Sequence, residues 1–171
     1  MPLNLERLST LVVEDTEPMR DLITAVLERF GIGRVLLASN GNEAFGVFCE
    51  HAPDIIITDW HMNSGTGIDL VTKIRRAEES PNRVAPVIML TGFNAASRVK
   101  KSRDSGITEY LTKPFKAEDL LKRILYVINA PRDFILNPSY FGPDRRRKKS
   151  DAYDGPLRRM SDYPDFNSNP L

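Results

Sequence analysis

Five side chains that could do chemistry stand at or just after the ends of short apolar runs in this 171-residue sequence: Glu14, Asp15, Asp59, Thr91 and Lys113. Carboxylate oxygens without a His or Cys cluster are the ligands that Mg²⁺ prefers. A hydroxyl and an ammonium beside them would complete a pocket for a phosphoryl group, because phosphoryl transfer needs positioning and charge neutralisation. An aspartate can itself be the nucleophile. Asp59 is the expected acceptor, since it ends the central run.

Taken one at a time, these residues have ordinary structural explanations. An aspartate at a strand end is often a turn residue or a helix cap, and Thr91-Gly92 could simply begin a turn. Lys113-Pro114 is common in exposed loops. These residues form one site only if the fold brings the separate strand ends together.

The elements that must position these residues are visible as apolar periodicity over residues 1–130. The expected strands are Leu8–Val13, Arg34–Ala38, Asp54–Thr58, Pro86–Leu90 and Thr108–Leu111. Two of them contain apolar runs without alternation, which is typical of central parallel strands covered on both faces. The expected helices lie at Met19–Phe30, Asn42–His51, Gly67–Glu79, Ala95–Ser105 and Leu120–Ile128.

Five strand–helix pairs with short connections predict an α/β fold with a doubly wound, five-stranded parallel sheet. At this length the flavodoxin-like strand order 2-1-3-4-5 is the natural choice, and a ligand then binds at the carboxyl ends of the strands. That edge is where all five candidate side chains would meet.

Composition excludes several classes of protein. The formal net charge is +1, with 24 Lys+Arg against 23 Asp+Glu, which argues against a uniformly basic nucleic-acid coat. The single cysteine, Cys49, excludes an intramolecular disulfide framework. The sequence has no apolar run long enough to span a membrane, so we expect a cytoplasmic protein with no membrane partner.

The chain changes character at Pro131. Residues 1–130 carry 16 Lys+Arg and 17 Asp+Glu, a net of −1, whereas residues 131–171 carry 8 and 6, a net of +2. Six of the 12 prolines lie in the second part. We therefore expect one domain over 1–130 and an irregular, Pro/Arg-rich, aromatic-containing arm over 131–171, without a separate output domain.

Four separated stretches, residues 11–15, 55–60, 87–92 and 110–115, resemble the receiver domain of bacterial two-component response regulators of the chemotaxis (CheY-like) type. The resemblance spans about residues 8–129. It implies a stand-alone response regulator in a phosphorelay, phosphorylated on Asp59 by a sensor histidine kinase or a phosphotransfer protein. It also implies a signalling protein that switches protein–protein interactions rather than an enzyme.

The same resemblance implies roles for individual residues. Mg²⁺ would be bound by Asp15, Asp59 and the backbone carbonyl of His61, with Glu14 helping through water.

Thr91 and Lys113 would contact the phosphoryl oxygens, and Thr91 with Tyr110 would form the switch pair. Tyr110 could equally be a half-buried aromatic that never moves. Lys113-Pro114 would have a cis peptide bond.

Two positions of the acceptor loop set this sequence apart. Asn63 stands where such domains usually carry proline, which predicts a more mobile loop. His61 stands two residues after the acceptor. It is either an ordinary exposed side chain or a residue that tunes dephosphorylation.

Other function classes fit less well. A phosphatase with an aspartate nucleophile would want Asp-x-Asp, and Asp59-Trp60-His61 lacks the second aspartate. A flavodoxin-type cofactor binder needs a phosphate-cradling loop, where Glu14-Asp15 would repel phosphate. A non-phosphorylated scaffold using the basic tail would not need the complete acidic, Thr and Lys set.

The arm holds six of the 14 aromatic residues and five consecutive cations at 145–149. It could be a solvated segment, or an arm that wraps a dimer mate or kinase and is anchored by Phe134, Tyr140 and Phe141. Binding to nucleic acid or to an anionic surface is the third alternative, and it would be salt-sensitive and non-specific.

The expected helix at Ala95–Ser105 is rich in cations: Arg98, Lys100, Lys101 and Arg103. Such a run is either a solvated face or a docking face.

For the protein as a whole, we expect a homodimer and no specific nucleic-acid partner.

Overall fold

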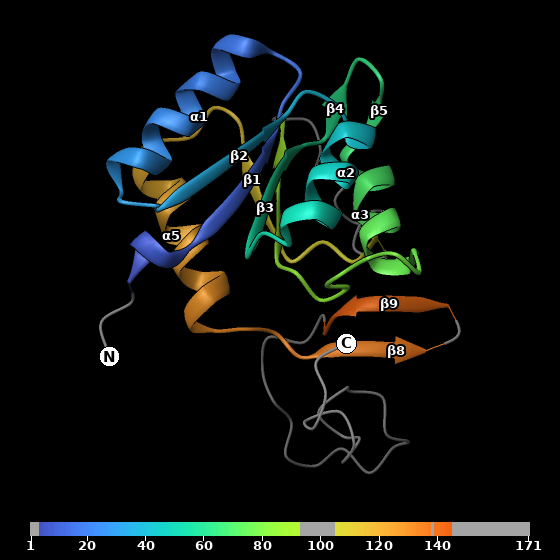
Figure 1. Cartoon of the computed structure of the whole chain (residues 1–171). Coiled ribbons are helices and arrows are strands. Elements are labelled where there is room, and N and C mark those ends of the chain that lie inside the picture. The colour runs from blue at the N-terminus through green and yellow to red at the C-terminus, as the bar shows by residue number, and fades with distance from the viewer. Residues whose placement is uncertain (1–3, 93–104, 138, 145–171) are drawn as a thin grey trace.

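The central sheet is parallel and has the predicted strand order. A computed structural model describes residues 4–92, 105–137 and 139–144. The sheet runs β2-β1-β3-β6-β7 (Figure 1), which is the order 2-1-3-4-5 when these five strands alone are numbered along the chain. Its strands are β1 (Ser9–Val13), β2 (Arg34–Ala38), β3 (Ile55–Asp59), β6 (Val87–Thr91) and β7 (Glu109–Thr112). The predicted fold class is confirmed.

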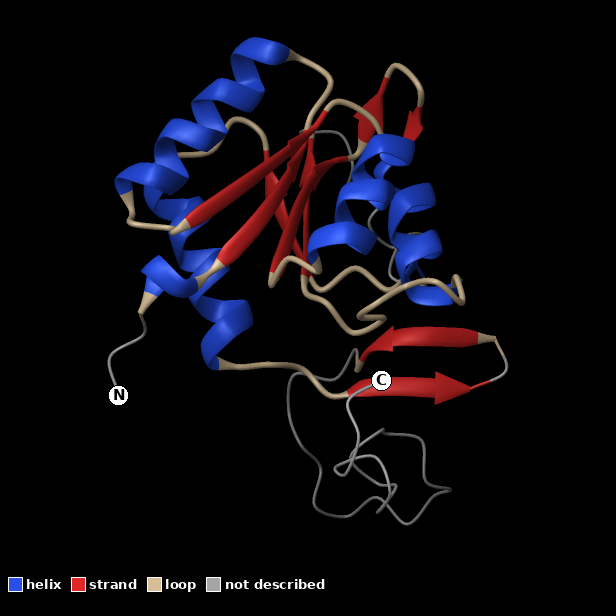
Figure 2. Ribbon diagram, in the orientation of Figure 1, coloured by secondary structure: helices blue, strands red, loops and turns tan. Residues whose placement is uncertain are grey.

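Helices cover both faces of this sheet (Figure 2). On one face lie α1 (Glu17–Arg29) and α5 (Ala117–Asn129), and on the other lie α2 (Gly41–His51) and α3 (Gly67–Arg76). A short 3-10 turn, η1 (Leu5–Arg7), precedes β1. The helix predicted at Ala95–Ser105, with its four cations, lies outside the described residues apart from Ser105. Within the described part of the chain, no helix is long and apolar enough to cross a membrane.

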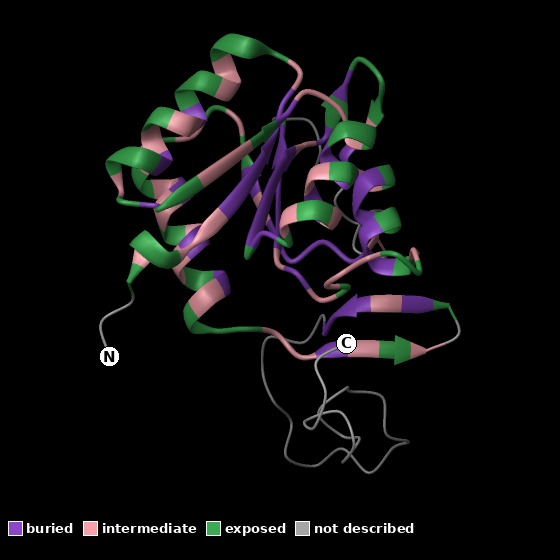
Figure 3. Ribbon diagram, in the orientation of Figure 1, coloured by how far each residue is buried: buried purple, intermediate pink, exposed green. Residues whose placement is uncertain are grey.

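The apolar strand runs divide their side chains between two cores. Ile56 of β3 packs in the cluster on the α2–α3 side, whereas Ile55 and Ile57 pack on the α1–α5 side. Val87 and Met89 of β6 belong to the first of these clusters. Figure 3 shows the central strands buried along their length. Because both faces are covered, polar alternation is impossible, which is why these runs predicted central strands.

Polar caps define the starts of the two helices whose apolar pattern is weak. The Asn40 side chain accepts a hydrogen bond from the N–H of Glu43 at the start of α2. Thr66 and Asp69 form a reciprocal capping box at the start of α3. The predicted limits of α2 and of β3 are each off by one residue, and the shift in β3 places Asp59 inside the strand.

The C-terminal segment begins with a hairpin, where the sequence predicts an irregular arm. β8 (Phe134–Asn137) and β9 (Tyr140–Pro143) pair antiparallel. The arm's proline content suggested irregular structure, yet Pro131 precedes this ladder and Pro143 ends it, so neither interrupts its interior. For residues 134–137 and 140–143 the prediction of an irregular arm is wrong. The basic run at 145–149 lies outside the described residues.

A buried arginine of α3 holds this hairpin against the domain. Arg75 is 3% exposed and donates to the carbonyls of Gly106 (3.0 Å) and Arg83 (2.8 Å). Its guanidinium carbon lies 5.0 Å from the centre of the Phe134 ring. Burial lowers the pKa of Arg75 to about 9, because the charged form is removed from water. The side chain is therefore a desolvated cation, held by carbonyl dipoles and an aromatic face.

The backbones also meet closely at this junction. Arg132 donates to the carbonyl of Thr108, just before β7, at 3.2 Å. A Cβ on Gly142 would lie 2.7 Å from the Cα of Gly106, so only glycine fits between the hairpin and the turn before β7. Figure 1 shows the hairpin at the end of the sheet opposite β4 (His61–Met62) and β5 (Gly65–Thr66).

The aromatic residues of the hairpin pack within the chain. Phe134 and Tyr140 are buried, and the rings of Phe134 and Phe141 lie 5.6 Å apart. Phe134 and Tyr140 are buried within their own chain, so their burial needs no partner, and the alternative in which these three anchor an arm on a dimer mate or a kinase remains a prediction.

Candidate functional site

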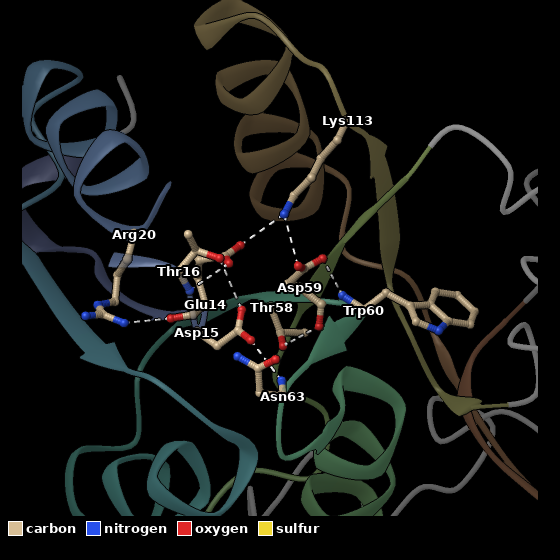
Figure 4. A network of polar contacts seen from close by, with 9 residues as sticks. All are labelled: Glu14, Asp15, Thr16, Arg20, Thr58, Asp59, Trp60, Asn63 and Lys113. Atoms are coloured by element: carbon tan, nitrogen blue, oxygen red, sulfur yellow. Dashed lines mark hydrogen bonds and ion pairs between the residues drawn. The ribbon is translucent and has the colours of Figure 1, made fainter. Parts of the chain in front are cut away.

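Four of the predicted side chains meet at the carboxyl edge of the sheet (Figure 4). One oxygen from each of Glu14, Asp15 and Asp59 lies within 4.8 Å of the other two. The Lys113 ammonium lies 3.0 Å from Oε2 of Glu14 and 3.0 Å from Oδ2 of Asp59. Glu14 and Asp15 follow β1, Asp59 ends β3 and Lys113 follows β7, so parallel topology alone assembles this rim.

Lys113 is the positive charge at the centre of this group. Burial by itself would lower its pKa, but hydrogen bonds and charges from Glu14 and Asp59 outweigh burial and raise the pKa of Lys113. Glu14 is 1% exposed, so its carboxylate depends on partners inside the protein. The rim therefore holds three acidic groups, two of which, Glu14 and Asp59, share one ammonium.

The acceptor candidate is held from two sides. The N–H of Trp60 donates to Oδ1 of Asp59 at 2.7 Å, while Lys113 contacts Oδ2. Helix α3 begins next to Asp59, because the N–H of Gly67, its first residue, donates to the Trp60 carbonyl at 2.9 Å. A Cβ at Gly67 would lie 2.3 Å from the Asp59 carbonyl oxygen, so this close approach requires glycine. The Asp59 carboxylate is thus fixed in orientation.

The loop after Asp59 is a small hairpin made by β4 and β5. His61 pairs with Thr66 and Met62 with Gly65. The N–H of Asn63, in its turn, donates to Oδ2 of Asp15 at 2.8 Å. This ladder and this added bond hold the turn, while the extra mobility that the missing proline suggested remains a prediction.

The loop after Asp59 influences the pKa of Asp15. Slight burial acts to raise its pKa, but hydrogen bonds, first among them the one from the Asn63 N–H, outweigh burial and lower the pKa of Asp15. The carboxylate is therefore favoured in its charged form. Three hard oxygen donors this close together fit a divalent cation such as Mg²⁺.

Thr91 and Tyr110 lie on the neighbouring strands. Thr91 ends β6, one residue past the partner of Asp59, and its hydroxyl donates to the Gly92 carbonyl at 3.1 Å. Tyr110 is half-buried on β7, and it packs against the core on the α2–α3 side. The structure places both near the rim, while their switch roles remain predictions.

His61 and Pro114 complete the predicted set. The His61 side chain is exposed on β4, with its ring 6.2 Å from that of Trp60. Its backbone carbonyl as a metal ligand and its part in dephosphorylation remain predictions. The Lys113-Pro114 peptide bond is cis, in agreement with the sequence prediction.

Three contributors to the rim were missed from the sequence. Arg20 of α1 donates to the Glu14 carbonyl at 2.8 Å. The sequence pattern that could have predicted this contact is a cation in the first turns of a helix that starts right after an acidic pair. The other two are the backbone N–H groups of Trp60 and Asn63. A backbone donor gives no residue-type signal, because nearly every residue carries one.

Comparisons with known proteins agree with this geometry. Residues 10–125 match the family described as response regulator receiver domain. The phosphate regulon transcriptional regulatory protein PhoB of Escherichia coli strain K12 is 36% identical over 118 residues, which are 69% of this chain and 50% of PhoB. This chain thus spans about half the length of such relatives.

Shorter relatives are covered almost completely. The chemotaxis protein CheY1 of Helicobacter pylori is 34% identical over 119 residues, 69% of this chain and 94% of CheY1. The structure of the chemotaxis response regulator CheY4 of Vibrio cholerae superimposes with a TM-score of 0.64 at 29% identity, covering 70% of this chain and 98% of CheY4. With the family match covering most of the chain, the conclusion is plain: this protein belongs to the response regulator receiver domain family.

Proposed function

We propose that this chain is a phospho-accepting signalling switch, in which Asp59 takes a phosphoryl group from a sensor histidine kinase or a phosphotransfer protein. The phosphorylated form then changes which proteins the chain binds. The observation that carries this proposal is the position of Lys113, 3.0 Å from both Asp59 and Glu14. An ammonium there neutralises the Asp59 carboxylate and, after transfer, a phosphoryl group attached to it.

Glu14, Asp15 and Asp59 would hold Mg²⁺, with the His61 carbonyl as a further ligand. The donor set supports this, because three carboxylate oxygens lie within 4.8 Å of one another with one ammonium among them. When bound, the ion supplies positive charge to the oxygens of the transferring phosphoryl group. Members of the receiver family bind Mg²⁺ through such an acidic pocket.

The transfer forms one bond and breaks one. An Asp59 carboxylate oxygen attacks phosphorus, and the P–N bond of a phosphohistidine breaks, its electron pair leaving with the imidazole. With acetyl phosphate as donor the breaking bond is P–O, and acetate leaves. The Trp60 N–H and Lys113 orient the acceptor before the donor arrives, which removes an ordering cost from the reaction. Water later hydrolyses the acyl phosphate, which releases inorganic phosphate and restores the Asp59 carboxylate. The phosphoryl group that is hydrolysed is the one carried by the chain itself.

The switch would start at Thr91. Its hydroxyl donates to the Gly92 carbonyl here, and in the phosphorylated form it would turn to a phosphoryl oxygen. Tyr110, half-buried on the adjacent strand, would then turn inward. Full switching of such a two-state element from 1:99 to 99:1 needs about 5.5 kcal/mol of differential stabilisation.

The relatives support a receiver role rather than a particular output. CheY1 is a chemotaxis protein and is covered over nearly its whole length, whereas PhoB, a transcriptional regulator, is covered over half. Homodimerisation, the lack of specific nucleic-acid binding, a cytoplasmic location and tuning of hydrolysis by His61 stay predictions. The phosphatase alternative is disfavoured, because His61 stands where it needs a second aspartate.

The test is incubation with Mg²⁺ and acetyl phosphate, followed by intact-mass measurement. The wild type should gain one phosphoryl group and Asp59→Asn none. Asp54→Asn is a matched control, because Asp54 stands just before the other end of β3, where it accepts a hydrogen bond from the Ser9 N–H at 2.8 Å. It should gain the phosphoryl group normally. A wild type that gains nothing, or an Asp59→Asn variant that still gains the group, contradicts the proposal.

A further inference from the structure

The turn of the acceptor-loop hairpin reaches back across the rim to the first strand. The N–H of Asn63 donates to Oδ2 of Asp15 at 2.8 Å, joining residues 48 positions apart. The other Asp15 oxygen, Oδ1, has a long contact of 3.4 Å with the Thr16 hydroxyl. One oxygen of Asp15 is therefore firmly held by the Asn63 N–H, and hydrogen bonding with the Glu14 side chain and with its own backbone also acts on this carboxyl.

This hydrogen bond depends on the residue type at position 63 in one respect. Proline, which resembling domains usually carry there, has no N–H and could not make the bond. Any other residue could, because the donor belongs to the backbone and not to the asparagine side chain. The departure of this sequence from the family pattern therefore adds a donor to the acidic rim.

A donor at this place has a clear physical effect. Charged carboxylate oxygens within 4.8 Å repel one another. Lys113 holds Glu14 and Asp59 against this repulsion, whereas Asp15 would rotate away unless another donor held it. The Asn63 N–H opposes that rotation for Asp15, since a hydrogen bond to a charged acceptor is stronger than one to a neutral acceptor. The β4–β5 ladder and the capping box at Thr66 hold the donor in turn.

We propose that the backbone N–H of Asn63 preorganises Asp15 for a divalent cation, which makes Asn63 a positioning residue of the acceptor site. The inference rests on the proposed function, because it takes the acidic rim to be a Mg²⁺ site. A ligand that is already oriented loses less freedom when the cation binds, so the affinity rises. The hydrogen bond from the Asn63 N–H therefore orders the Asp15 side chain, which a proline at position 63 could not do through its backbone.

The experiment compares Asn63→Pro with Asn63→Ala. Alanine keeps the N–H and removes the side chain, whereas proline removes the N–H, and proline should fit because resembling domains carry it. Mg²⁺ titration is followed by the fluorescence of Trp60, the sole tryptophan of the chain and next to Asp59. We expect Asn63→Pro to bind Mg²⁺ roughly three- to tenfold more weakly than the wild type, and Asn63→Ala to match it.

Two results overturn the inference: equal affinity of the proline and alanine variants, or tighter binding by the proline variant, which would mean that the N–H competes with the cation. Asn63→Gly guards against an effect of loop stiffness, since it loosens the turn but keeps the donor and should bind within about twofold of wild type. Calorimetric titration gives the same affinities without a fluorophore.

Failure of the proposed function looks different. In that case the wild type itself shows no saturable response to Mg²⁺, and Asp15→Asn leaves the titration unchanged. If the wild type binds Mg²⁺ and Asp15→Asn abolishes binding, while Asn63→Pro behaves as Asn63→Ala, the metal site stands and the role of Asn63 alone is refuted.

Discussion

The two ends of the central sheet deal with charge in opposite ways. At the carboxyl edge, three acidic side chains lie close together, and two of them, Glu14 and Asp59, contact Lys113, whose side chain stays 23% exposed. At the opposite end, the Arg75 guanidinium is buried under the β8–β9 hairpin, and it donates to the carbonyls of Gly106 and Arg83. Among the described residues no carboxylate pairs with Arg75.

This difference separates reactivity from stability. The rim keeps like charges close together, and all but Glu14 are partly exposed, which suits a site that must accept a cation and an anionic group. At the hairpin end two carbonyls and an aromatic ring hold the Arg75 cation away from water, and its Nη2 has no hydrogen-bond partner in the described part of the chain. Damage at the hairpin end should therefore cost stability, and damage at the rim should mainly cost chemistry.

The largest expected change in stability comes from Phe134→Ala. Phe134 is buried, touches Phe141 and covers Arg75, so truncation leaves a cavity beside a desolvated cation. We expect a loss of about 3 kcal/mol in the free energy of unfolding. Urea unfolding measures this loss. Phosphoryl uptake from acetyl phosphate should stay within about twofold, because the rim lies at the other end of the strands.

Leu136→Ala is the matched control on the same strand. Leu136 is 57% exposed, so its truncation should change stability by less than about 0.5 kcal/mol. Equal losses for the two variants would mean that the hairpin does not pack on the domain through Phe134. A Phe134→Ala variant with full stability and no phosphoryl uptake would reverse the comparison between the two ends.

A smaller effect is expected from Lys113→Ala at the rim. Its removal leaves Glu14, 1% exposed, and Asp59 without their shared cation. In the presence of a chelator we expect a loss of about 2 kcal/mol. Mg²⁺ should restore more stability to this variant than it adds to the wild type, since it replaces the missing positive charge. Thermal unfolding with and without Mg²⁺ measures both quantities.

Lys122→Ala is the control for loss of a lysine as such. Its ammonium is 3.8 Å from Asp119 on the exposed side of α5, so we expect less than about 0.5 kcal/mol and no added response to Mg²⁺. If Mg²⁺ stabilises Lys113→Ala no more than it stabilises Lys122→Ala, the rim does not behave as a cation site.

Much of the rim was predictable because the sheet order determines it. The unbroken apolar runs at 55–57 and 87–90 predict buried parallel strands, and parallel strands bring Glu14, Asp59 and Lys113 to one edge. No side-chain contact had to be known for that step. The contact from the Asn63 N–H was not predictable, since it depends on the path of a turn.

The burial of Arg75 at the hairpin end could not be predicted from the sequence, for a different reason. Arg75 stands among other cations, Lys73 and Arg76, in a helix, a pattern that is typical of an exposed face. Its burial is created by β8 and β9, which come some 60 residues later and whose prolines suggested an irregular arm. Tertiary contacts between distant short elements leave little local pattern.

The smallest expected effect is a pH dependence at the rim. Hydrogen bonds hold the pKa of Asp15 below its ordinary value of 3.8, despite slight burial, so its contribution to stability is present above 3.8 and is lost as pH falls through the lower, folded value. Lys113 has its pKa raised above 10.5, despite burial, so its contribution is present below 10.5 and is lost as pH rises through the folded value.

The difference in unfolding free energy between the wild type and Asp15→Asn should therefore be constant between about pH 5 and pH 9. Below pH 3.8 it should shift against the wild type, by less than about 1 kcal/mol, because Asp15 is partly exposed and its bonds are screened. Urea unfolding at several pH values, in chelator, measures the shift. A shift in favour of the wild type on acidification would mean that repulsion among the three carboxylates, and not the bond from Asn63, dominates the environment of Asp15.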